Sequence, residues 1–189
     1  METQAGAARC AGTTVNGYCI TPGANLKHAN LAGADLRHAN LNIANLTRSN
    51  LASADLTDAI LSAAFLGGAN LRRATLVGAD LQYAVLRGSM IKRADLSGAN
   101  LSGADLSGAV LCASLRLANL SGAVLKGANL GGANLESADL SGADLSGVDL
   151  TLAKLRGADL SEVVSGGISG TPTSLPTGWQ LIDGSLVGP

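Results

Sequence analysis

The fold is decided by a run of five-residue units that begins Ala24-Asn25-Leu26-Lys27-His28, Ala29-Asn30-Leu31-Ala32-Gly33, Ala34-Asp35-Leu36-Arg37-His38. Leucine recurs at every fifth position from Leu26 to Leu111, with Ile91 as the one substitute, and again from Leu115 to Leu160. These positions define 28 repeats, most of them with Asp or Asn just before the central residue. Alanine stands two residues before the central residue in 25 repeats, the exceptions being Ser49, Ser89 and Val148.

A period of five fits neither of the common secondary structures. On an α-helix five residues advance by about 500°, so the leucines would be scattered around every face. On a strand the side-chain period is two, so an odd spacing would turn each successive leucine to the opposite side. Both objections vanish if the chain turns a corner in every repeat, because each Leu and its preceding Ala can then point toward a common axis. The sequence therefore predicts a solenoid.

The pattern resembles that of the pentapeptide-repeat family, whose motif is A(D/N)LXX, over residues 24–162. The resemblance implies an all-β fold, a right-handed quadrilateral β-helix of about seven coils with four repeats in each. The central Leu and the Ala two before it would lie inside, and the Asp or Asn between them is expected to hydrogen-bond the backbone of the turn. The chain would then comprise an N-terminal segment with a cap (1–23), the β-helix (24–162) and a linker with a second cap (163–189).

Two short segments outside the repeats share a pattern that predicts β-hairpins with two-residue loops. These are Val15-Asn16-Gly17-Tyr18-Cys19-Ile20 and Ile182-Asp183-Gly184-Ser185-Leu186-Val187. A solenoid leaves strand edges uncovered at its ends, so we expect the hairpins to cap it, with Trp179 over the last coil. Repeats start directly after Pro22, whereas the chain stops after Pro189. We therefore expect that such a module can be followed by another solenoid in a longer protein.

The three cysteines allow two interpretations at the first hairpin. Cys19 aligns with Leu186 of the second hairpin, which favours a buried apolar role, and a disulfide with Cys10 is the alternative. Cys112 lies at a corner and is expected to be an exposed free thiol.

The repeat ladder slips once, because only four residues separate Leu111 from Leu115. Apolar residues replace the usual outward Asp or Asn close to this slip. With four repeats per coil, one face contains Phe65, Val85 and Val124. The next face contains Met90 and Val110. Exposed apolar surface is typical of contact sites, so this strip is a candidate for binding a partner protein or a second copy; packing within the corner is the alternative.

Four basic residues, Arg72, Arg73, Lys92 and Arg93, share one face on adjacent coils. No aromatic side chains are interleaved with them for base stacking, so we do not expect nucleic-acid binding. Docking onto an acidic partner is the functional interpretation, and solvated surface charge is the alternative.

No pattern in the sequence indicates catalysis, a cofactor or a metal. His28 and His38 are two repeats apart and would lie on opposite faces, and the cysteines lack the close pairs of zinc sites. No serine stands beside a histidine that could activate it. No uninterrupted run of about 18 apolar residues is present, and the first residues lack a secretory signal pattern. We therefore expect a soluble protein without an enzymatic site, cytoplasmic by default.

Charge is distributed unevenly along a chain whose net charge is −1. Residues 1–93 contain nine Lys or Arg and five Asp or Glu, whereas residues 94–189 contain four and nine. The function favoured is a structural or protein-interaction scaffold, with self-association through the apolar strip or the ends as one mode of binding. The family resemblance implies an alternative, since some members protect DNA gyrase from quinolones as rods that mimic DNA. Only the acidic end supports it, through Glu136, Asp139, Asp144, Asp149, Asp159 and Glu162.

Overall fold

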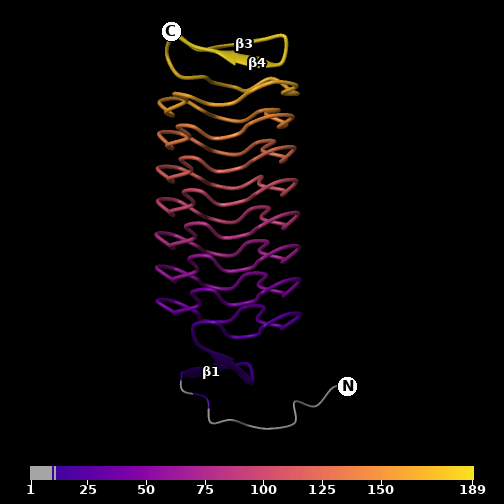
Figure 1. Cartoon of the computed structure of the whole chain (residues 1–189), viewed down its shortest axis with the longest axis vertical. Helices are drawn as coiled ribbons and strands as arrows, with labels where there is room; N and C mark the ends of the chain where they lie inside the picture. The colour runs from indigo at the N-terminus through magenta and orange to yellow at the C-terminus, as the bar shows by residue number, and fades with distance from the viewer. Residues whose placement is uncertain (1–9, 11) are drawn as a thin grey trace.

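The chain forms a straight rod of stacked coils with a short β-hairpin at each end (Figure 1). The structure is a computed structural model and describes residue 10 and residues 12–189. Four short strands are present in this part of the chain: β1 (Thr13–Val15), β2 (Tyr18–Ile20), β3 (Gln180–Ile182) and β4 (Ser185–Val187). No helix occurs among the described residues. The architecture is therefore that of an all-β solenoid.

The coils of the rod contain 20 residues each, except for one coil of 19. Parallel β-bridges join residues that are 20 positions apart, from Asn25 with Asn45 to Met90 with Val110. The partner of Asp95 is Ser114, which is only 19 residues away, and the spacing of 20 returns with the bridge from Ser114 to Asn134. The missing residue of the slip is thus absorbed inside a single coil and the ladder continues beyond it.

The interior of the rod consists of stacked leucine and alanine. Every central residue from Leu26 to Leu160 is buried, and so are nearly all of the alanines that precede them. Burying one leucine contributes about 1.5–3 kcal/mol. Because each coil contacts only its neighbours, stability accumulates from the stacking of adjacent coils.

Each corner is a β-turn closed by the repeat itself. The Ala29 N–H donates to the Leu26 carbonyl at 3.0 Å, and His28, between them, has a left-handed φ of 60°. The side chain of Asn25 accepts a hydrogen bond from the Lys27 N–H at 3.4 Å, which satisfies a turn donor. Asp and Asn do the same at many other corners. The predicted structural role of these polar residues is confirmed.

Both predicted hairpins are present and antiparallel. Val15 lies opposite Tyr18 and Ile182 opposite Ser185, so each loop contains two residues, Asn16-Gly17 or Asp183-Gly184. All four loop residues have positive φ, as a type I′ turn requires.

A disulfide joins Cys10 to Cys19 in β2. The interpretation of Cys19 as a buried apolar residue is therefore wrong, since its sulfur is bonded to Cys10 and its side chain is only partly buried. Cys112 is a free thiol, as expected, but it is half-buried rather than fully exposed.

The bridge ladder extends past the last repeat. Val164, Ser169 and Ser174 bridge to residues of the preceding coil although no A(D/N)L motif surrounds them. Part of the segment assigned to a linker on sequence grounds thus continues the stack.

Two serines stand at inward positions normally occupied by alanine. Ser49 and Ser89 are 1% and 0% exposed, and among the described residues their hydroxyl oxygens have no hydrogen-bond partner. A buried hydroxyl without a partner is destabilising because it loses its bonds to water.

Replacing Ser89 with alanine is therefore expected to raise the free energy of unfolding by about 1 kcal/mol. Equilibrium denaturation would measure the change. Ser62 provides the contrast, since its Oγ donates to Asp80 Oδ2 at 2.6 Å, and Ser62→Ala is expected to destabilise the protein. A destabilising effect of Ser89→Ala would show that its hydroxyl has a partner after all.

Candidate interaction surface

The first face of the apolar strip contains Phe65 and Val85 as direct neighbours. Phe65 bridges to Val85 on the next coil, and Val85 bridges to Asp105, beyond which lies Val124. Phe65 is 46% exposed, whereas Val85 is half-buried. Val124 is thus separated from the other two by a carboxylate, and the predicted strip is shorter on this face than the sequence suggests.

The second face contributes Met90 and Val110, which bridge to one another and are both half-buried. In each coil a single two-residue corner separates the two faces. It is Gly67-Gly68 in one coil and Arg87-Gly88 in the next. This corner joins the face of Phe65 and Val85 to that of Met90, with the exposed side chain of Arg87 between them.

Sequence reasoning missed Ile60, another apolar residue at an outward position. Ile60 is 40% exposed and bridges to Asp80, on the face that precedes Phe65. The signal for it was the same as for Phe65, an apolar residue in place of Asp or Asn.

The four basic residues lie together at the next corner of the same two coils. Arg72 and Arg73 follow Leu71, and Lys92 and Arg93 follow Ile91 on the neighbouring coil, where the Arg73 N–H donates to the Lys92 carbonyl at 3.1 Å. All four side chains are exposed and line a hollow of about 300 Å³. We call this set the basic corner. It adjoins the apolar face of Met90 directly, since only Ile91 separates Met90 from Lys92.

The acidic neighbour of the strip is already paired. Arg87 forms an ion pair with Asp105, and the Ser107 hydroxyl donates to the same carboxylate at 2.7 Å. Burial alone would raise the pKa of the Asp105 carboxyl, but the hydrogen bonds from Ser107 and Arg87 outweigh it and lower the pKa. Asp105 therefore remains charged and compensates Arg87 rather than the basic corner.

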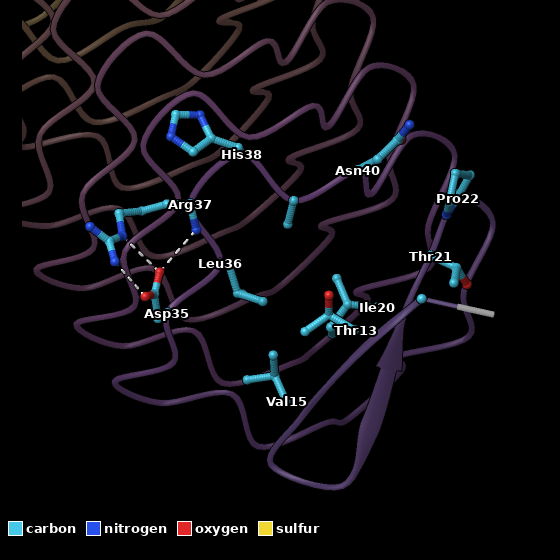
Figure 2. A pocket seen from close by; sticks show the side chains of 12 residues that line it. Thr13, Val15, Ile20, Thr21, Pro22, Asp35, Leu36, Arg37, His38 and Asn40 are labelled. Atoms are coloured by element: carbon cyan, nitrogen blue, oxygen red, sulfur yellow. Dashed lines mark hydrogen bonds and ion pairs between the residues drawn. The ribbon is translucent and has the colours of Figure 1, made fainter. Parts of the chain in front are cut away.

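A second hollow, of about 340 Å³, lies between the N-terminal hairpin and the first coils. Figure 2 shows Val15 and Ile20 of the hairpin on one side and Leu36 with Arg37 on the other. Arg37 is paired with Asp35 at 2.7 Å, which lowers the pKa of that carboxyl to about 2. The polar groups at this rim thus satisfy one another.

Neither histidine takes part in a cluster suited to metal binding. His38 Nδ1 lies 3.7 Å from the Asp58 carboxylate, and His28 is on another corner. Within residue 10 and residues 12–189 no three His, Cys, Asp or Glu side chains are grouped closely enough to hold a metal ion. The same part of the chain contains no helix with the length and hydropathy needed to cross a bilayer.

Coils of 20 residues, a turn at every corner and an interior of leucine and alanine define a β-helical repeat protein. The family model for pentapeptide repeats matches this chain in overlapping segments, at residues 24–62, 54–90, 69–108, 91–114 and 113–151. These matches span more than half of the chain, which belongs to the pentapeptide-repeat family. No curated protein matches the sequence at a significant level.

Several solved structures are similar to the chain. HetL, a pentapeptide-repeat protein involved in heterocyst differentiation regulation in the cyanobacterium Nostoc sp. strain PCC 7120, is 34% identical over 77% of this chain and 82% of its own, with a TM-score of 0.31. QnrB1, a plasmid-mediated fluoroquinolone resistance protein, is 18% identical over 79% of this chain and 90% of its own, with a TM-score of 0.48. A pentapeptide-repeat protein of the Arabidopsis thaliana thylakoid lumen is 30% identical over 64% of this chain and 67% of its own, with a TM-score of 0.22. With TM-scores below 0.5, these superpositions carry no argument about a shared site.

Proposed function

We propose that the protein is a non-enzymatic scaffold that binds another protein through the apolar strip and the basic corner. The observation that supports the proposal is the position of Phe65, Val85, Met90 and the four cations on the same two neighbouring coils. Apolar side chains surrounded by charged groups are typical of the centre and rim of a protein interface.

The repeat pattern itself adds weight to a binding role for the strip. Asp or Asn at the outward position stabilises the turn by accepting its N–H, as Asn70 does for Arg72 at 3.3 Å. Phe65, Val85 and Met90 cannot supply that hydrogen bond, so each exposes apolar surface and also forgoes a turn contact. A partner that covers them would recover the lost burial, at about 25 cal/mol for each Å² of apolar surface removed from water.

The proposal includes about seven coils across residues 24–162, with the two hairpins serving as caps. Ile20 of β2 and Leu186 of β4 are buried in the hydrophobic core, and the partly buried Trp179 packs against this core. The Tyr18 hydroxyl accepts a hydrogen bond from the Asn30 N–H at 3.3 Å, and the Ile168 N–H donates to the Gly184 carbonyl at 2.9 Å. These contacts suit elements that shield the open ends of the stack from edge-to-edge association.

The strip is tested by replacing Phe65 with serine together with Val85→Thr. We expect this variant to lose binding of the partner by at least tenfold while keeping its fold, because both side chains are outward and leave the core unchanged. Leu117→Ser is the matched control, since Leu117 is 67% exposed on the opposite corner of the rod. Affinity capture with purified protein, followed by titration of the captured partner, measures the loss.

Light scattering after size-exclusion chromatography, applied to the same variants, distinguishes a foreign partner from a second copy. A mass that falls only in the strip variant identifies self-association. Equal retention of every partner by wild type, the strip variant and Leu117→Ser would contradict the proposal.

The alternative function is binding to a type II topoisomerase by mimicry of DNA. Its support is the acidic end, where hydrogen bonds from Ser146, Thr151 and Ser161 lower the pKa values of Asp144, Asp149 and Asp159. Carboxylates whose pKa is lowered in the folded protein stay charged at neutral pH, as a mimic of phosphates needs. A gyrase supercoiling assay with a quinolone separates the two functions, because protection at stoichiometric protein would favour mimicry over the scaffold.

A further inference from the structure

The basic corner concentrates positive charge that nothing in the described part of the chain neutralises. The ion pairs of the described residues involve none of the four basic residues of this corner. Their basic members are Arg37, His38, Arg87, Arg116 and Arg156. The corners on the adjoining coils are uncharged, with Ala52-Ser53 on one side and Cys112 on the other. Asp95 is the acidic residue nearest in sequence, and its carboxylate accepts from both the backbone and the hydroxyl of Ser97 at the following corner.

A backbone donor is also left without an acceptor at this corner. In the coil below, the Arg72 N–H donates to Asn70 Oδ1 at 3.3 Å. The equivalent N–H belongs to Lys92, and the residue at the position of Asn70 is Met90, which has no oxygen to offer. Among the described residues the Lys92 N–H therefore has no hydrogen-bond acceptor. By comparison with Arg72, this N–H faces the outward side chain two residues earlier, which is Met90 here, at the edge of the basic corner.

The two observations specify the chemistry of a ligand. Arginine guanidinium groups bind phosphate through paired, parallel N–H donors, and lysine adds a compact point charge. Neighbouring coils are about 4.8 Å apart, so the Arg72-Arg73 and Lys92-Arg93 pairs can reach two adjacent phosphate groups. The hollow of about 300 Å³ has room for more than a single phosphate.

We propose that the basic corner is a binding site for a small anion that carries a pyrophosphate group. The four cations neutralise its charges, and the Lys92 N–H donates to one of its oxygens. This site goes beyond the scaffold function, although it shares the basic corner with the proposed protein interface. The two proposals are tested separately, because the strip variant of Phe65 and Val85 leaves all four cations in place. Exposed like charges held this close raise the local potential, which attracts a multivalent anion.

Isothermal titration of inorganic pyrophosphate into the protein at low salt tests the site. We expect saturable binding of one pyrophosphate per chain, and weaker binding of orthophosphate and sulfate at equal ionic strength. Citrate distinguishes a phosphate site from a general carboxylate site, and tighter binding of citrate than of pyrophosphate would overturn the proposal. The absence of saturable pyrophosphate binding would also overturn the proposal. This holds even if an acidic peptide binds to the basic corner.

Arg93→Gly removes one cation without straining the fold, because Arg93 has a left-handed φ of 61° that glycine adopts freely. We expect at least a tenfold loss of pyrophosphate affinity. Arg48→Gly is the matched control: Arg48 has a φ of 55° at the same turn position, lies on another corner and forms no ion pair within the described residues. Equal losses of pyrophosphate affinity in the two variants would show that the effect comes from net charge alone and would overturn the proposed site.

Met90→Asn tests the backbone donor while all four cations remain. The new side chain is expected to accept the Lys92 N–H, as Asn70 does for Arg72, and so to compete with the ligand. We expect a threefold or greater loss of pyrophosphate affinity in a variant that is at least as stable as wild type. Unchanged affinity, with the new hydrogen bond established by its amide chemical shift, would remove the Lys92 N–H from the site.

Discussion

Leu101→Ala is expected to lower the free energy of unfolding by about 2–5 kcal/mol. Leu101 is fully buried in the middle of the rod, and it lies between Leu81 and Leu120 of the adjoining coils. Removing its side chain forfeits the transfer free energy of the lost methyl groups and leaves a cavity, because the neighbouring backbones are held by the ladder and cannot collapse into it. Urea denaturation followed by circular dichroism measures the change.

Leu117→Ala is the control for that experiment, since it makes the same chemical change at a leucine that is 67% exposed. Its effect is expected to stay within about 0.5 kcal/mol, as is usual for surface substitutions. Comparable losses at Leu101 and Leu117 would contradict the division into inward and outward positions on which the whole fold depends.

The all-β solenoid and its inward and outward positions could be predicted from the sequence because the repeat leaves few alternatives. A period of five with Leu and Ala at fixed places is compatible with a corner in every repeat and with neither helix nor plain strand. The loops Asn16-Gly17 and Asp183-Gly184 likewise identify the hairpins, because few other residue pairs accept two successive positive φ values.

The rest could not be predicted because it depends on contacts between coils rather than on the motif. Val164, Ser169 and Ser174 continue the ladder through backbone hydrogen bonds alone, which leave no mark in side-chain type. The pairing of Cys10 with Cys19 depends on how the segment before β1 returns to β2.

The candidate site shows the same division between pattern and contact. A count of four repeats per coil predicts that the four basic residues share one face, and in the structure they line one hollow together. The same count already places Asp105 between Val85 and Val124, but it does not show that Asp105 pairs with Arg87, since that contact depends on side-chain reach.

Ala99→Leu is expected to lower the free energy of unfolding by about 1–3 kcal/mol, although it adds apolar surface to the core. Ala99 is fully buried, and Ala79 and Ala118 stand at the same position on the coils on either side. The ladder fixes the spacing of the coils at both of these contacts. A larger side chain must therefore displace Leu96 or Leu101 from its rotamer or spread the coils and lengthen their hydrogen bonds. Thermal and urea denaturation should both report the loss.

Ala32→Leu makes the same change at an exposed corner, where the Ala32 side chain points outward and only its N–H is engaged, by Asn30 Oδ1 at 3.4 Å. The enlarged side chain has free space there, so we expect an effect within about 0.5 kcal/mol. The comparison separates steric from hydrophobic effects, since both variants add the same methyl groups. If Ala99→Leu were as stable as wild type, the interior would have room to spare. The recurrence of alanine along this chain would then need an explanation other than the narrowness of the coil.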